Sequence, residues 1–294
     1  MIVSASYRTD IPAFYAGWFL RRLRAGFCRV VNPYGGGDYE VSLRPGAVDG
    51  FVLWSRNLRP LLPDLDAVRR IAPFVVQFTV TGYPRVLETS VINVSDAVDQ
   101  LREVRRRFGK RAAVWRYDPI VFTDGLDAAA HMAGFAALAR ALKGTVDEVV
   151  LSVMHPYKKT RRNLDRAVSR SGIAWRDPPA EEKRALLQRL AAIAHEEGMA
   201  PNLCSQPELL QLESDIGLGE ASCIDAARLG DVAQRPVAAP TSGNRPGCRC
   251  ALSRDIGAYD TCPHGCVYCY AVADRARAVA NFRRHDPESA TLRP

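Results

Sequence analysis

The segment EVVLSV at Glu148–Val153 is followed by a longer amphipathic segment, Lys159–Ser171. A short run rich in β-branched residues is typical of a strand buried on both faces, and the periodicity after it predicts a helix. This succession of a strand and a helix recurs along the first two-thirds of the chain. The expected strands are Ile2–Ala5, Gly50–Trp54, Phe74–Thr81, Ala112–Arg116, Glu148–Val153 and Met199–Leu203. The expected helices are Pro12–Ala25, Leu58–Ile71, Val94–Phe108, Gly125–Leu142, Lys159–Ser171 and Ala180–Glu197.

Alternation of apolar strands with helices predicts an α/β fold with a parallel sheet covered by helices. Six such units, and one more after Ala251, suit a (β/α) barrel that is complete or partial and TIM-like. An open, doubly wound sheet is the alternative. The runs Cys28–Val31 and Tyr39–Leu43 flank three glycines and predict a hairpin inserted before the second strand.

Composition indicates an ordinary soluble enzyme, with 47% hydrophobic and 24% charged residues. No apolar run approaches the roughly 20 residues that span a bilayer, so we expect no membrane partner. The N-terminal residues have no basic-then-apolar signal segment, which predicts a cytoplasmic protein.

The formal net charge is +8. A basic balance can indicate a nucleic-acid partner. Here the excess consists mostly of arginines distributed along the expected helices, as at Arg105–Arg107. We therefore interpret it as solvated helix surface and keep nucleic acid as a minor alternative substrate.

Seven of the eight cysteines lie between Cys204 and Cys269, whereas Cys28 stands alone in an apolar stretch. The last three form a C-x₃-C-x₂-C loop at Cys262, Cys266 and Cys269. Three thiolates on so short a loop can hold three corners of a 4Fe-4S cluster and leave the fourth iron without a protein ligand. The alternative for this loop is part of a zinc site, because C-x₂-C is a common zinc spacing.

The octet Cys262–Cys269, with an aromatic residue before its third cysteine, resembles the cluster loop of the radical S-adenosylmethionine (radical SAM) enzymes. The resemblance implies a 4Fe-4S cluster, S-adenosylmethionine as cofactor, and an electron donor such as flavodoxin or ferredoxin. It also implies that Tyr268 packs against the adenine. That family normally carries the loop near the N-terminus, so the resemblance implies a circularly permuted barrel. We expect one domain over residues 1–294, with 204–250 a loop-rich insertion and 251–284 the cluster-binding strand, loop and helix. The strand of this last unit is expected at Asp255–Tyr259.

Four further cysteines make up a second set: Cys204, Cys223, Cys248 and Cys250. Four thiolates saturate either a second 4Fe-4S cluster or a structural zinc ion, and both assignments stay open.

Polar residues that follow the expected strands would gather at the catalytic end of a barrel. The predicted catalytic residues are Arg8, Asp10, Arg116, Asp118 and His155. Radical SAM enzymes usually receive the methionine amino group on a Gly-Gly-Glu motif, which is missing at the expected strand. Ser55 and Asn57 are therefore the candidates for that contact.

Taken whole, the chain resembles an uncharacterised bacterial family, a domain of unknown function with a C-terminal cysteine cluster. The matching stretches are Ser4–Pro12, Phe51–Asn57, Asp255–Cys262 and Tyr268–Ala271. Arg116–Pro119 also resembles spore photoproduct lyase-like proteins, which act on DNA. The expected function is reductive cleavage of S-adenosylmethionine to start radical chemistry on an unknown substrate. The alternative is a non-catalytic iron–sulfur or zinc protein that binds nucleic acid or carries electrons.

Overall fold

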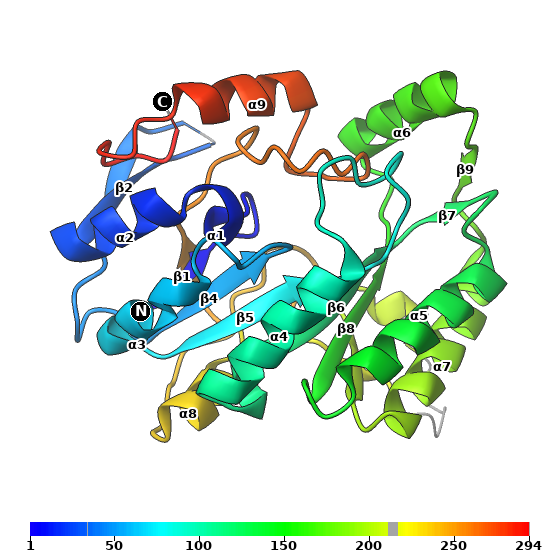
Figure 1. The fold of residues 1–294 in the computed structure, drawn as a ribbon, viewed down its shortest axis with the longest axis horizontal. Coiled ribbons are helices and arrows are strands. Elements are labelled where there is room, and N and C mark those ends of the chain that lie inside the picture. The colour runs from blue at the N-terminus through cyan, green and yellow to red at the C-terminus, as the bar shows by residue number, and fades with distance from the viewer. Residues whose placement is uncertain (34, 211–216, 294) are drawn as a thin grey trace.

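The computed structural model describes residues 1–33, 35–210 and 217–293. Its centre is a sheet of eight parallel strands (Figure 1). In chain order they are β1 (Ile2–Ala5), β4 (Gly50–Ser55), β5 (Phe74–Thr79), β6 (Ala113–Ile120), β8 (Glu148–Val153), β10 (Ala200–Leu203), β11 (Gly219–Glu220) and β12 (Ser253–Asp255). The expected α/β fold with a parallel sheet is confirmed.

The strands lie in the order β11-β10-β8-β6-β5-β4-β1-β12. From β1 to β11 this is chain order without the reversal that defines a doubly wound sheet, so that alternative is wrong. β12 pairs with β1, with Ser4 opposite Asp255, as the expected return of the last unit to the first strand requires. β11 and β12 stand at opposite edges of the sheet. A complete barrel is therefore wrong for the described residues, since the sheet stays open.

One face of the sheet carries most of the helices and the larger hydrophobic core. Sheet residues such as Val76, Trp115 and Leu151 pack there against helical side chains such as Phe19, Leu101 and Phe135. The helices are α1 (Ile11–Phe14), α2 (Ala16–Ala25), α3 (Leu65–Ile71), α4 (Val94–Phe108), α5 (Ala128–Leu142), α6 (Lys158–Ser171), α7 (Ala180–Glu196), α8 (Ala226–Ala233) and α9 (Arg275–Arg284).

The opposite face has a smaller core closed by α8, whose Leu229 packs among Ile2, Val52 and Val75. At Gly50 an added Cβ would lie 2.7 Å from Leu229 Cδ2, so a larger residue there would displace this leucine side chain. Arg228 is 1% exposed and bonds to Asp147, Glu148 and two carbonyl groups, which fixes α8 beneath the sheet.

Within the expected loop-rich stretch 204–250 the structure forms β11 and α8, and residues 211–216 lie outside the described part. The expected strand Asp255–Tyr259 is misplaced, since β12 ends at Asp255. Within 251–284 the structure has β12, then the cysteine loop, then α9, which begins only at Arg275. The predicted hairpin is present as β2 (Phe27–Val31) and β3 (Asp38–Ser42), and β7 (Phe122–Thr123) pairs with β9 (Trp175–Arg176).

None of the helices formed by the described residues has both the length and the hydrophobicity needed to cross a membrane.

The buried histidine of α5 makes stability depend on pH. His131 is fully buried between the Tyr117 hydroxyl, 2.9 Å from Nδ1, and the Val121 carbonyl, 3.1 Å from Nε2. Burial lowers the pKa of His131 to about 4, against about 6.5 in the unfolded chain. The unfolded state therefore binds more protons between these values, so stability falls as the pH drops from 6.5 to 4. We expect a loss of roughly 3 kcal/mol from this residue.

Urea unfolding across that pH range measures this loss, and His131→Gln should remove most of the slope. An unchanged slope in His131→Gln would assign the pH dependence to other groups.

Candidate functional site

The cysteine loop lies between β12 and α9, at the carboxyl end of the sheet. Cys262, Cys266 and Cys269 line one cavity of about 580 Å³, which reaches the surface between α6 and α9. Burial raises the pKa of Cys266 to about 12 and also raises the pKa values of Cys262 and Cys269. Metals bind thiolates, so a metal entering here must displace protons. Soft sulfur donors are suited to an iron–sulfur cluster, and this donor set fits one.

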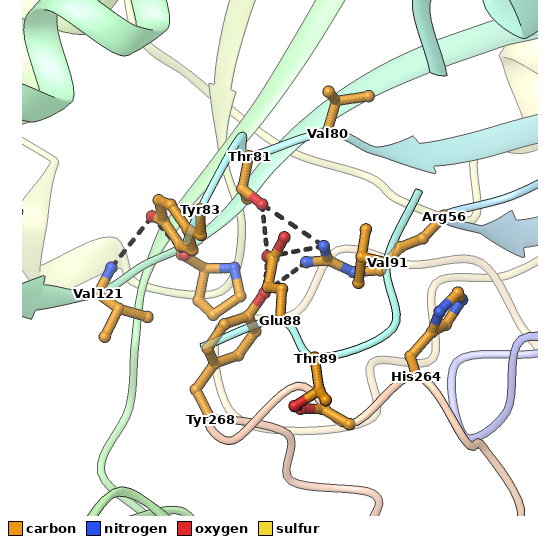
Figure 2. A network of polar contacts seen from close by, with 12 residues as sticks. Arg56, Val80, Thr81, Tyr83, Glu88, Thr89, Val91, Val121, His264 and Tyr268 are labelled. Carbon is orange, nitrogen blue, oxygen red and sulfur yellow. Dashed lines mark hydrogen bonds and ion pairs between the residues drawn. The ribbon is translucent and has the colours of Figure 1, made fainter. Parts of the chain in front are cut away.

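A buried ion pair fixes the loop at Tyr268, next to its third cysteine (Figure 2). The Arg56 guanidinium donates to Glu88 Oε1 at 2.7 Å and to the Tyr268 hydroxyl at 2.6 Å. The hydroxyls of Tyr268 and Thr81 also donate to Glu88. All four side chains are buried. The Tyr268 hydroxyl is thus anchored in protein, and its predicted contact with adenine stays a prediction.

Asp10 connects the same loop to β4 and α1. Its carboxylate accepts bonds from the Ser55 hydroxyl, the Arg56 amide and the Ala13 amide, which begins α1. His264 Nε2 lies 2.7 Å from its Oδ2. Asp10 and Ser55 therefore hold the loop in place, so we assign them a positioning role.

Asn57 reaches these contacts only through its backbone amide, which donates to Ser55 Oγ at 3.0 Å, and His155 lies apart from them. Asn57 Oδ1 accepts bonds from the Arg59 amide and from Gln100, which orders the turn after β4. His155 is exposed, with its ring against Tyr157 at 4.4 Å between centres. The roles predicted for Asn57 and His155 gain no support from these positions.

Two ion pairs lie near the carboxyl edge of the sheet, where Arg8 follows β1 and Arg116 of β6 is opposite Thr79, the last residue of β5. Arg8 Nε donates to Asp255 Oδ1 at 2.8 Å, so the partner of Arg8 is Asp255 of β12. Arg116 pairs with Asp118 and lies 5.0 Å from the centre of the Trp54 ring. Burial would raise the pKa of Asp118, but the Arg116 guanidinium holds it below its usual range. Both arginines are charged, and each is already paired with a carboxylate of this chain.

The second set of cysteines gathers beside Arg116, on the face closed by α8. Cys204 Sγ lies 3.5 Å from Cys223 Sγ. Cys223 also contacts Cys250, and Cys250 contacts Cys248. The Arg116 guanidinium donates to Cys223 Sγ at 2.9 Å, and Arg245 reaches Cys204 Sγ at 3.6 Å. The hydrogen bond with Cys250 lowers the pKa of Cys248 to about 5. The four thiols predicted as one set are therefore brought together.

Within residues 1–33, 35–210 and 217–293, no three His, Cys, Asp or Glu side chains are grouped as ligands of a single metal ion. The iron–sulfur and zinc assignments of both sets stay predictions.

Sequence reasoning missed Glu88, Asp255 and His264. Glu88 lies in an irregular stretch, and no sequence signal marks it. Asp255 was assigned to the start of a strand, whereas it stands at a strand's end. His264 lies inside the cysteine octet, but its position in the sequence did not indicate that it contacts Asp10.

The sequence matches the family model described as "Domain of unknown function (DUF1848)" over residues 2–271. The chain belongs to this family. The predicted membership of an uncharacterised family is thereby confirmed, and the family brings no assigned reaction. No curated protein matches the sequence.

Several solved structures match weakly. They are a D-hydantoinase (10% identity, 66% of this chain, 37% of that chain), a D-hydantoinase from Bacillus sp. AR9 (8%, 64% and 38%), and a dihydropyrimidinase from Brevibacillus agri NCHU1002 (10%, 75% and 39%). Each TM-score is 0.29, too low to support an argument about fold or function. This DUF1848 chain spans less than two-fifths of each of these proteins.

Proposed function

We propose that this protein is a radical SAM enzyme that binds a 4Fe-4S cluster on Cys262, Cys266 and Cys269. The observation that carries the proposal is the arrangement of these three thiols around one cavity at the carboxyl end of a parallel sheet. Active sites of (β/α) folds lie at that end. The loop is also rigidly supported, by the Arg56–Glu88–Tyr268 network on one side and the Asp10–His264 contact on the other.

When bound, an open-iron cluster supplies the electron that cleaves a carbon–sulfur bond of S-adenosylmethionine, and this starts radical chemistry. The chain's own residues hold and enclose that site. The three thiols serve as ligands, and Tyr268 and His264 fix the two ends of the loop between them. Arg8 follows β1 and Arg116 lies within β6, and both are buried and paired with a carboxylate, so we assign them to shaping this end of the sheet.

Anaerobic reconstitution with iron and sulfide, reduction by dithionite and chromatography of the products test the proposal. We expect about four irons bound by the loop and release of 5′-deoxyadenosine from S-adenosylmethionine. Methylthioadenosine alone would indicate cleavage of a different bond and another reaction class. A reduced, cluster-loaded protein that forms neither product would instead be a non-catalytic iron–sulfur protein. A colourless protein that binds zinc at these sulfurs would contradict the proposal.

The second set makes a separate prediction about metal content. If its four thiols hold a cluster, reconstituted protein contains about eight irons per chain. If they hold zinc, it contains about four irons and one zinc. We expect Cys250→Ser to remove only the metal of the second set, as measured by elemental analysis. Loss of all iron in Cys250→Ser would contradict the prediction that the two sets of cysteines bind metal independently.

A further inference from the structure

The basic charge of the chain is concentrated on two helices. α6 carries six Lys and Arg residues against one acid, Asp165. α9 carries four arginines and no acid, and Asp274 caps its N-terminus. These two helices with Asp274 have a net charge of +8, which equals the formal charge of the whole chain. The rest of the chain is therefore neutral in sum, and the excess expected on helix surfaces is concentrated on these two helices.

The ten cations face solvent. Every one of them is exposed: Lys158, Lys159, Arg161, Arg162, Arg166, Arg170, Arg275, Arg277, Arg283 and Arg284. The acids nearest to them neutralise little, since Arg166 lies 3.8 Å from Asp274 and Arg277 lies 3.8 Å from Asp260. Exposed charges at such distances attract one another weakly. The two helices thus form one positive surface, which we call the α6/α9 face.

The α6/α9 face surrounds the opening above the cysteine loop. α6 and α9 lie at the same side of the molecule, above the loop that connects β12 with α9 (Figure 1). Arg166 and Arg170 of α6 and Arg275 of α9 line the same cavity as the three loop cysteines. Arg275 is held toward the cavity by a bond to the Ser90 hydroxyl at 2.8 Å. Positive charge therefore borders the route by which a macromolecule would approach a cluster from solvent.

We propose that the α6/α9 face docks an acidic one-electron donor protein, such as a flavodoxin, that reduces the cluster. This inference rests on the proposed function, because it needs a redox centre in the loop. Electron transfer requires a close approach of donor and acceptor, and the cavity brings the sulfurs near this surface. Transient redox complexes use small interfaces, and charge complementarity accelerates their encounter. Nucleic acid could also bind a basic surface, but the position of the charge around the cysteine cavity favours an electron donor.

Charge reversal on α6 tests the docking. The rate of cluster reduction by chemically reduced flavodoxin is measured anaerobically, by stopped-flow absorbance, for the wild type and for Arg166→Glu/Arg170→Glu. We expect the double variant to react at least tenfold more slowly at low ionic strength, since steering changes association rates by about 10–10³-fold. The difference should shrink at about 0.5 M salt, where the Debye length is only a few ångströms.

The matched control is Arg70→Glu/Arg189→Glu, which makes the same charge change on exposed residues of α3 and α7, away from this face (Figure 1). Its rate should stay close to that of the wild type apart from a small general charge effect. Equal rates for the two double variants would overturn the docking proposal. Docking is also overturned if a DNA duplex binds the wild type and is lost in the α6 variant while flavodoxin reduces both equally.

Two measurements keep failure of docking distinct from failure of the function. Excess dithionite should reduce the cluster of every variant to the same extent, because a small reductant needs no docking surface. If the wild type cannot be loaded with a cluster at all, the proposed function fails, and the docking proposal falls with it. Circular dichroism of Arg166→Glu/Arg170→Glu identifies any loss of α6 itself.

Discussion

Cys266→Ser should remove about four irons per chain and abolish cleavage of S-adenosylmethionine in the same protein. Cys266 is the middle thiol of the loop, and the Arg56–Glu88–Tyr268 network lies against it. A serine hydroxyl is a poor replacement for a soft thiolate at iron. Mutating a partner outside the ligand set typically costs 10–100-fold in affinity or activity, so losing a ligand should cost more than about 100-fold.

Cys28→Ala is the matched control, because Cys28 is a buried cysteine of the helix-covered core, away from the loop. It should keep its iron and its activity. Iron analysis and chromatography of nucleoside products measure both variants. Full iron content and normal product formation in Cys266→Ser would contradict the assignment of this loop. Equal loss in Cys28→Ala would show that the assay reports general unfolding.

Glu88→Ala should destabilise the protein by about 3–5 kcal/mol, the usual cost of leaving one charge of a buried pair without its partner. Arg56 is 9% exposed and Glu88 is 3% exposed, so neither can recover its hydration after the substitution. The Tyr268 hydroxyl loses its acceptor at the same time, so the end of the cysteine loop at Tyr268 is held less firmly. We therefore expect a fall in melting temperature of roughly 10 °C, and weaker retention of iron.

Two comparisons separate the buried charge from other effects. Arg56→Met/Glu88→Met removes both charges and should lose less stability than Glu88→Ala alone. Glu103→Ala removes the half-exposed partner of the exposed Arg106 on α4 and should change the melting temperature little. If Glu88→Ala and Glu103→Ala melt alike, the pair does not support the loop as described.

Strands buried on both faces are the part of the fold that sequence predicts best. Glu148–Val153 and Ile2–Ala5 form strands with the expected bounds, because their β-branched residues suit a fully covered sheet. β12 reads Ser-Arg-Asp and has no such signal, so it was misplaced. Pairing with β1 makes it a strand, which is a tertiary effect that local propensity cannot show. α8 was missed for a related reason, since the buried contacts of Arg228 and Leu229 hold it against the sheet.

For the site, spacing in the sequence grouped the cysteines but did not show which residues support them. The two sets of cysteines could be grouped from their positions in the sequence, and the structure places the members of each set together. The partners of Arg8 and Tyr268 could not be found that way. Asp255 lies 247 residues from Arg8, and Glu88 lies 180 residues from Tyr268. Only the folded sheet brings such residues into contact.

The pairing of β12 with β1 also has a consequence during synthesis. Ser4 lies opposite Asp255, so the backbone groups of β1 on that side wait for about 250 residues of translation before their partners emerge. Until then a nascent chain presents an open strand edge of the kind that recruits other chains. Ribosome-bound intermediates of this protein are thus expected to need chaperone protection until β12 has emerged.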